Sequence, residues 1–421
     1  MTPELKTVFQ MVKKDICCKT GRQTFTLFSS QILALGLGIL TGIINTRTLG
    51  PTDYGVFTFF FTFTGFTVLF FRFGLASSVS LLLAETKDKE KEKELIGATV
   101  VIAFFVGVAY STFVFVSSFF VDDLFHTNVE WILRYASVLV MALPFTLFIP
   151  LIGRGTNQIG LLSMFNVIPK TIYIFSALIL LNLIQIEPLH FVLLNLSGTI
   201  IGVLILLHAF SPKFSNLYEN LEEILRKTKE YGFHVYLGQI ANQSTYKLDG
   251  IFITLFVNTT QLGFYSLAMT MTSSMVGLSQ ALSTSLFKSF ANLDRIPRKV
   301  FLYNFTWLIL CVLGLALFGP VLIYVLFGEE FLPAAKMILP LALAGLFQGM
   351  YQPYTFLASK GKGKWIRNVA YTEMAANIVG NVFLIYLYGA FGAAVASAIS
   401  KFIHWIMLRN YYNIYLRGIV T

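Results

Sequence analysis

Charged residues are scarce in this chain of 421 residues, where Asp, Glu, Lys and Arg make up only 12%. An average soluble domain carries about 25%. Cysteine is scarce too: Cys17 and Cys18 are adjacent and Cys311 stands far from both. Three cysteines so placed provide neither a disulfide framework nor the ligand spacing of a zinc site. The composition therefore excludes a secreted disulfide scaffold, a zinc enzyme and a sizeable soluble catalytic domain.

Apolar residues are abundant instead, at 56% of the chain, and phenylalanine alone contributes 42 residues. A helix that crosses a bilayer needs about 20 consecutive, mostly apolar residues. Stretches of this kind, separated by short connectors rich in Gly, Pro, Asn and Asp, predict an all-α polytopic membrane protein with about twelve transmembrane helices. They are residues 24–46, 55–83, 96–121, 131–152, 161–182, 190–209, 231–256, 262–285, 300–325, 335–357, 369–388 and 391–410.

The net charge of +10 lies in the connectors and not in one basic domain, so we expect no nucleic-acid partner. If the N-terminus is cytoplasmic, 24 of the 31 Lys and Arg residues fall on the cytoplasmic side, three fall outside and four lie within spans. Cytoplasmic loops carry such an excess. The first 23 residues are polar and basic, without the pattern of a cleavable signal peptide. We therefore expect a multi-pass protein of the plasma or inner membrane with both termini in the cytoplasm.

The predicted spans form two halves of six helices. The longest cytoplasmic connection separates them and carries an amphipathic segment, residues 216–232, which is predicted to lie along the membrane interface. Short similarities, such as LGPTDYG at 49–55 and LGFY at 262–265, suggest a parallel pseudo-two-fold repeat. The predicted division is a cytoplasmic N-terminal segment (1–23), an N-lobe (24–209), an interlobe linker (210–230), a C-lobe (231–410) and a cytoplasmic C-terminal tail (411–421).

Four cations stand inside predicted spans: Arg72, Lys170, Lys247 and Lys401. Charges at that depth are costly and usually face a cavity or a partner. A cavity with surplus positive charge favours an anionic ligand, and phosphate suits Arg and Lys donors. The alternatives stay open: Arg72 can snorkel toward the cytoplasm, and Lys401 can pair with an acid on another helix.

Polar side chains also recur at helical spacing within two spans. The first set is Gln239, Asn242, Gln243, Tyr246 and Asp249, and the second is Glu373, Asn377 and Asn381. A helix with such a stripe faces water or protein and not lipid. Hydrogen bonds between helices are the alternative role for the amides, and Glu373 is placed to offset one buried cation.

Little indicates an enzyme. The predicted outer loops have about ten residues or fewer, and their paired acids, Asp122 with Asp123 and Glu329 with Glu330, are adjacent in sequence. Such pairs are more typical of solvated loops and helix starts than of a general acid and base. We therefore expect no catalytic residues, no metal site and no cofactor.

Several segments together carry a family resemblance that spans nearly the whole chain. They are NTRTLGPTDYGVF at 45–57, RFGLASSVS at 72–80, LDGIFITLFVNTTQLGFYSLA at 248–268, LFGEEFLPAAKMILPL at 326–341, LASKGKGKWIRN at 357–368 and YGAFGAAVAS at 388–397. In order and spacing the chain resembles the polysaccharide transport family, the Wzx-type oligosaccharide or O-antigen flippases. This family belongs to the superfamily of MATE drug exporters and oligosaccharidyl-lipid and polysaccharide exporters.

The resemblance implies two six-helix lobes around a cationic cavity that opens alternately to each side of the membrane. The implied cargo is a polyprenyl-diphosphate-linked oligosaccharide, moved to the outer leaflet for capsule, O-antigen or related polymers. Arg72 and Lys247 would then attract the diphosphate, with Lys170 and Lys401 as weaker candidates. Asp249 and its neighbouring amides would be the place for coupling to H⁺ or Na⁺. The implied partners are the lipid-linked cargo, the membrane and other polysaccharide-assembly proteins.

Three alternatives remain at the level of the sequence. A MATE-like exporter of cationic drugs shares the fold, although it should carry more acids than cations in its lobes. A polysaccharide polymerase or ligase should carry a large outer loop, which this chain lacks. A scaffold that binds anionic lipids without transport would share every feature described.

Overall fold

The computed structural model describes the backbone of residues 19–291 and 293–420. Side chains are described over the same residues except 19–25, 28, 234, 235, 237–239, 241–246, 285, 288, 289, 291, 419 and 420. Every regular element in the described part is a helix, as the hydropathy pattern predicts. The predicted N-terminal segment lies outside the described residues as far as residue 18.

The chain forms two compact units. The first comprises residues up to 41 together with 70–117 and 133–237. Helix α2 (Lys19–Thr67) runs through both units, and η1 (Val68–Phe71), α6 (Glu130–Val140) and α11 (Phe233–Phe256) lie at the divisions between them. The remaining helices of the first unit are α3 (Leu75–Glu85), α4 (Lys89–Ser117), α7 (Leu143–Gly155), α8 (Ile159–Leu181), α9 (Pro188–Phe210), α10 (Leu217–Lys227) and the π-helical turn η2 (Thr228–Gly232).

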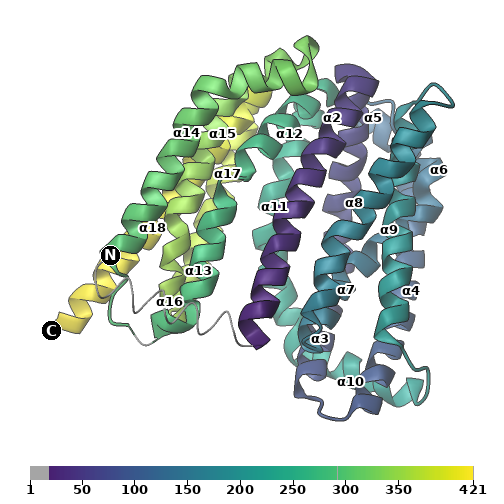
Figure 1. The fold of residues 1–421 in the computed structure, drawn as a ribbon, viewed down its shortest axis with the longest axis vertical. Coiled ribbons are helices and arrows are strands. Elements are labelled where there is room, and N and C mark those ends of the chain that lie inside the picture. The colour runs from purple at the N-terminus through teal and green to yellow at the C-terminus, as the bar shows by residue number, and fades with distance from the viewer. Residues whose placement is uncertain (1–18, 292, 421) are drawn as a thin grey trace. The chain divides into compact units, whose positions relative to one another are not determined.

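The second unit comprises residues 42–69, 118–132 and 238 onward. Its helices are α5 (Val121–Phe125), α12 (Thr259–Ser273), α13 (Val276–Ala291), α14 (Arg298–Phe327), η3 (Glu329–Ala334), α15 (Ala335–Tyr351), η4 (Gln352–Thr355), α16 (Phe356–Ser359), α17 (Gly363–Tyr388) and α18 (Ala390–Val420). Within it, α15 packs against α14 and α18, and α18 packs against α17. Figure 1 shows these four long helices side by side.

The compact units differ from the predicted lobes in composition, because residues 42–69 and 118–132 group by contacts with the C-terminal half. This grouping describes local packing in one conformation. The lobes 24–209 and 231–410, the linker between them and their repeat symmetry stay predictions.

Each predicted span falls in a helical part of the chain. By length and composition, eight helical segments of the described part can cross a membrane, and the first of them, Ser29–Phe71, includes residues of two predicted spans. The predicted spans 231–256, 262–285 and 369–388 lie in α11, in α12 with α13, and in α17. Each of these helices is shorter or more polar than the eight segments that can cross a membrane. The protein is a multi-pass helical membrane protein.

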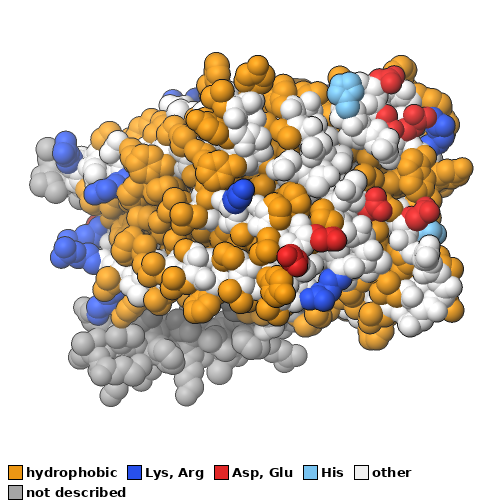
Figure 2. Space-filling view, turned by 90° about the horizontal axis from the view of Figure 1, so that it is seen from above, with side chains coloured by type: hydrophobic (Ala, Val, Ile, Leu, Met, Phe, Trp, Pro, Cys, Tyr) orange, Lys and Arg blue, Asp and Glu red, His pale blue; other side chains and the backbone are white. Residues whose placement is uncertain are grey.

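Large hydrophobic side chains remain exposed along many helices, as in Leu317 (70%) and Phe105 (66%). Figure 2 shows one face on which hydrophobic side chains are plentiful and charged ones stand in small groups. Exposed apolar surface on this scale is stable only against lipid.

Two breaks shape the N-terminal part. The predicted connector at 49–55 is a kink within α2, where Gly50 has a φ of 68°, a backbone conformation that only glycine adopts without strain. The second span, predicted as continuous over 55–83, is interrupted between η1 and α3, where Phe73 and Gly74 have φ values of 46° and 76°. These left-handed residues end one helix and start the next, and Arg72 lies in the break.

Helix α10 carries the apolar stripe of the segment that is predicted to lie along the membrane interface. Ile224 is fully buried in the hydrophobic core of the first unit, and Leu217 and Leu221 pack against the same core. An ion pair of 2.9 Å joins Lys91 of α4 to Glu223 of α10. Three residues of the stripe therefore pack within the protein, while Leu225 of the same stripe is 52% exposed, and the interfacial position of α10 stays a prediction.

Two segments outside the predicted spans are helical. The charged run at 85–94, which lies between two predicted spans, contains the first turns of α4 from Lys89 onward. The predicted tail 411–421 continues α18 as far as Val420. Alternating charges stabilise the start of α4 through ion pairs between neighbouring turns, such as Lys93 with Glu90 at 3.2 Å.

The contact between α2 and α12 in the second unit depends on Gly55. A Cβ placed there would lie 2.3 Å from the carbonyl oxygen of Thr259, and Gly263 faces Gly55 across the same contact. We expect Gly55→Val to lower the free energy of unfolding by about 1–3 kcal/mol or more, because the two backbones must separate. Thermal unfolding of the detergent-purified protein measures the loss. Gly314→Val in α14, where a Cβ meets no atom within 4 Å, is the matched control, and equal melting temperatures would refute the packing role.

Candidate functional site

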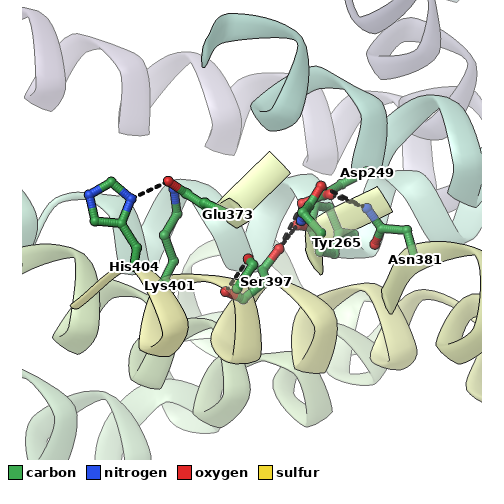
Figure 3. A network of polar contacts seen from close by, with 9 residues as sticks. Asp249, Tyr265, Glu373, Asn381, Ser397, Lys401 and His404 are labelled. Carbon is green, nitrogen blue, oxygen red and sulfur yellow. Dashed lines mark hydrogen bonds and ion pairs between the residues drawn. The ribbon is translucent and has the colours of Figure 1, made fainter. Parts of the chain in front are cut away.

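A buried carboxylate organises the centre of the second unit. Asp249 of α11 is only 4% exposed and accepts three hydrogen bonds. Its donors are the Tyr265 hydroxyl of α12 at 2.6 Å, the Asn381 amide of α17 at 2.6 Å and the Ser397 hydroxyl of α18 at 2.7 Å. Figure 3 shows these side chains converging on Asp249 from three further helices. Four segments far apart in sequence thus meet at one charge.

Local sequence explains this convergence. The turn at Val257 and Asn258 reverses the chain between α11 and α12, and Asn258 caps α12 by accepting a hydrogen bond from the Gln261 amide at 2.8 Å. The two helices form a hairpin in which Asp249 and Tyr265 face each other. A similar short connection at Gly389, with a φ of 60°, joins α17 to α18 and brings Asn381 opposite Ser397.

The site contains hydrogen-bond acceptors that are not fully used. The Oδ1 atom of Asn381 is buried without a hydrogen-bond partner within the described residues, and the Oδ1 atom of Asn377 accepts only the Asn381 amide, at 3.1 Å. Asp249, Asn377 and Ser397 line a small cavity with a volume of ≈ 50 Å³ for water-sized molecules. A few waters or one small cation fit this space, while an oligosaccharide does not. Carboxylate, amide and hydroxyl oxygens are the ligands that hard cations prefer.

A second buried acid lies on α17, on the helix face that also carries Asn377 and Asn381. Glu373, 5% exposed, accepts from the Lys401 ammonium and from Nδ1 of His404, both on α18. The His404 ring stacks on Tyr351 with centroids 4.0 Å apart. Figure 3 shows this ion pair beside the Asp249 network along α18. Lys401 therefore makes the interhelical salt bridge that the sequence left as its alternative role, and Glu373 offsets its charge.

The other predicted cations lie in different surroundings. In the first unit, the Lys170 ammonium donates to the Ala34 carbonyl of α2 at 2.7 Å. In the second unit, Lys247 is exposed on α11, and its Nζ is 3.2 Å from the Cβ position of Gly65. A larger residue than glycine at position 65 would crowd this ammonium.

Arg72 lies in the helix break of the first unit. Its Nε atom is buried and has no hydrogen-bond partner within the described residues. The nearby Tyr236 hydroxyl donates to the Phe70 carbonyl at 2.9 Å and so satisfies a backbone group that the break leaves open. Discontinuous helices form the substrate and ion sites of many membrane transporters.

Part of the predicted stripe on α11 falls outside the described side chains: Gln239, Asn242, Gln243 and Tyr246. The stripe on α17 is confirmed as a buried face that contains Glu373, Asn377 and Asn381. Sequence reasoning missed Tyr265 and Ser397. Ser397 shares one face of α18 with Ser400, Lys401 and His404, and this helical spacing was the signal that could have found it.

The paired acids of the predicted outer loops have structural roles where their contacts are described. Asp122 accepts hydrogen bonds from the Thr127 hydroxyl at 2.7 Å and from the backbone amides of Val129 and Glu130 at 2.9 and 3.1 Å. It thereby caps the start of α6, as expected for an acid at a helix N-terminus.

The buried pair of Glu373 and Lys401 gives a stability prediction. Glu373→Gln leaves the Lys401 ammonium buried without its counter-charge, which should cost about 3–5 kcal/mol in free energy of unfolding. The double variant Glu373→Gln with Lys401→Met removes both charges and should recover much of that loss. Thermal unfolding of the single and double variants measures the coupling. If the double variant melts no higher than Glu373→Gln, the pair does not carry this stability.

Solved structures with the same arrangement of helices are membrane transporters. The lipid II flippase MurJ in an inward closed conformation aligns with a TM-score of 0.71 over 92% of this chain and 87% of that chain, at 17% identity. An inward-facing multidrug resistance MATE family transporter of the MOP superfamily aligns with a TM-score of 0.66 over 94% of this chain and 98% of that chain, at 13% identity. At these identities the likeness shows a common fold.

Sequence relatives cover most of the chain as well. An uncharacterized membrane protein of Methanocaldococcus jannaschii is 22% identical over 411 residues, which cover 90% of this chain and 80% of the relative. The probable low-salt glycan biosynthesis flippase Agl15 of Haloferax volcanii is 21% identical over 408 residues, 93% of this chain and 83% of the relative. Residues 20–293 match the family described as "Polysaccharide biosynthesis protein". This match spans more than half of the sequence, and the protein therefore belongs to the polysaccharide biosynthesis protein family.

Proposed function

We propose that this protein is a flippase that moves a polyprenyl-diphosphate-linked oligosaccharide from the cytoplasmic to the outer leaflet by alternating access. The observation that carries the proposal is the family match over residues 20–293. Two further findings support it: the fold shared with a lipid II flippase and the relative named as a probable glycan biosynthesis flippase. The cargo would serve the assembly of a surface polysaccharide, and the membrane would be the plasma or inner membrane.

Cations within the helices support an anionic cargo. Arg72 combines an unused buried donor with a broken helix, and Lys247 is exposed on α11. We assign the diphosphate to these two residues. Lys170 and Lys401 are weaker candidates, because a carbonyl holds the first and Glu373 holds the second. Electrostatic attraction to a diphosphate grows as water is excluded from its surroundings.

The Asp249 network supports coupling to an ion. Three donors stabilise the carboxylate now, and H⁺ or Na⁺ at Asp249 would compete with them. Because those donors come from α12, α17 and α18, a change in their hydrogen bonds alters the packing of these helices. An ion that binds one conformation more tightly shifts the population toward it. Asn377 and Glu373 belong to the same polar face, and the stripe on α11 adds candidates.

A reconstituted flipping assay tests the proposed function. Proteoliposomes would carry a fluorescent polyprenyl-diphosphate oligosaccharide in the inner leaflet, and an enzyme added outside would modify each molecule that is exposed. We expect exposure that depends on an imposed H⁺ or Na⁺ gradient. Correct insertion and lipid binding without exposure would contradict transport of this cargo and favour a scaffold. Export of a cationic dye instead of the lipid would favour function as a MATE-like exporter, because a MATE family transporter shares this fold.

Arg72→Ala and Lys247→Ala test the diphosphate assignment. Each removes a charged contact worth about 1.5–3 kcal/mol, so cargo affinity should fall by roughly ten- to 100-fold. We expect each variant to lose flipping while keeping its insertion and melting temperature, because neither residue forms an ion pair with an acid within the described part of the chain. Lys229→Ala, an exposed cation on the turn η2, is the matched control. Wild-type flipping in both test variants would remove the assignment.

Asp249→Asn tests ion coupling. The substitution keeps the shape of the side chain but removes the charge that a cation or proton requires, so gradient-driven flipping should fall to the rate without a gradient. Asp123→Asn, at an exposed acid of α5, should leave the rate unchanged. Thermal unfolding in NaCl against choline chloride identifies the ion, because bound Na⁺ raises the melting temperature of the wild type alone. Equal gradient dependence in Asp249→Asn would exclude this residue as the coupling site.

A further inference from the structure

Lys401 of α18 belongs to two buried groups of the second unit at once. Its ammonium forms the ion pair with Glu373, and the same side chain lines the cavity of ≈ 50 Å³ that Asp249 lines from α11. Asp249 and Lys401 are the charged members of that lining. One buried cation therefore adjoins two buried carboxylates, and Figure 3 shows both of them along α18.

The spacing along α18 brings the second carboxylate within reach of this lysine. Ser397 precedes Lys401 by four residues, and its hydroxyl donates to Asp249 at 2.7 Å. Four residues of a helix rise by about 6 Å, so the two side chains leave the same face on adjacent turns. The cavity between them holds only a few water molecules. A change of rotamer can therefore carry the ammonium from Glu373 to Asp249.

The other described groups around the two acids leave this role to Lys401. Asp249 accepts from three neutral side chains, one each on α12, α17 and α18: Tyr265, Asn381 and Ser397. On α18, Nδ1 of His404 bonds to Glu373. Lys247 precedes Asp249 by two residues on α11 but lies beside Gly65 of α2. Among the described side chains, Lys401 is the cation placed to serve both carboxylates.

We propose that Lys401 is a resident cation that exchanges between Glu373 and Asp249 and so competes with the coupling ion at Asp249. With an ion at Asp249, Lys401 pairs with Glu373, as in the ion pair described above. When the ion leaves, Lys401 turns to Asp249, while His404 keeps its hydrogen bond to Glu373. This inference rests on the proposed ion coupling and gives Lys401 a role other than cargo binding.

The exchange provides Asp249 with a counter-charge during the ion-free part of the cycle. A buried carboxylate that loses its partner is costly inside a bilayer. Because Lys401 and Ser397 share α18, the exchange also changes the bonds that this helix makes with α11 and α17. Release of the ion is thereby linked to helix packing in the second unit, and such a difference between states is what coupling requires.

Thermal unfolding of a set of variants tests the exchange without any bound ion. Purified protein in choline chloride would carry Asp249→Asn alone, with Glu373→Gln, or with both Glu373→Gln and Lys401→Met. In Glu373→Gln, Lys401 has only Asp249 left to pair with, at the expense of the present donors to Asp249. Asp249→Asn should therefore lower the melting temperature most in this background, because the wild-type lysine can fall back on Glu373.

The cost of Asp249→Asn should become small again once Lys401→Met is added. Glu223→Gln, which removes the acid from the ion pair with Lys91 in the first unit, is the matched background and should leave that cost at its wild-type value. An equal cost in wild type and in Glu373→Gln would overturn the exchange. If Glu373→Gln does not fold, Glu373→Asp replaces it, because a shorter side chain weakens the ion pair with Lys401.

The NaCl concentration that gives half of the rise in melting temperature measures the competition itself. Glu373→Gln should need about tenfold more NaCl than the wild type, and Glu373→Gln with Lys401→Met about tenfold less, because only molecules with a vacated Asp249 bind the ion. This double variant keeps the net charge of the wild type, so equal half-saturation in the two would overturn the competition. A wild type without any response to NaCl would exclude the proposed coupling to Na⁺, and the Asp249→Asn set would then decide the exchange alone. Flipping in proteoliposomes reports on the proposed function independently.

Discussion

The cost of a charge inside a bilayer is the constraint on which this structure depends. Asp249 and Glu373 are each nearly fully buried in the second unit, and each is surrounded by donors from other helices. A buried carboxylate without those donors would take up a proton or reorganise its surroundings. The hydrogen bonds of Asp249 therefore join α11 to α12, α17 and α18, and those of Glu373 join α17 to α18.

The two acids solve the same problem in different ways. Glu373 forms an ion pair with Lys401 and a hydrogen bond with His404, so its charge is balanced within the protein. Asp249 receives only hydroxyl and amide donors, and the neighbouring Asn381 oxygen has no partner within the described residues. Asp249 lines a cavity of ≈ 50 Å³ together with Lys401. The Glu373 pair joins α17 to α18, while the Asp249 network joins α11 to α12, α17 and α18 through neutral donors.

Glycine and left-handed backbone decide where the helices bend. Gly50 kinks α2, and Phe73 with Gly74 divides the second predicted span. Each break leaves backbone groups that a side chain must satisfy, as Tyr236 does for Phe70. Interrupted helices place polar side chains at membrane depth without exposing them to lipid, which is why Arg72 is tolerated there.

The sequence by itself determined the helical class, the positions of the spans and the candidate cations, because hydrophobic run length and helical periodicity are local properties. It also predicted the buried face of α17, since Glu373, Asn377 and Asn381 recur at one helical spacing. Only the tertiary structure decided that Lys401 pairs with Glu373 and that Tyr265 and Ser397 donate hydrogen bonds to Asp249. It also decided that α10 packs into the protein core. These contacts join residues that are up to 148 positions apart, and the pattern within one helix carries no information about the polar partner that another helix presents.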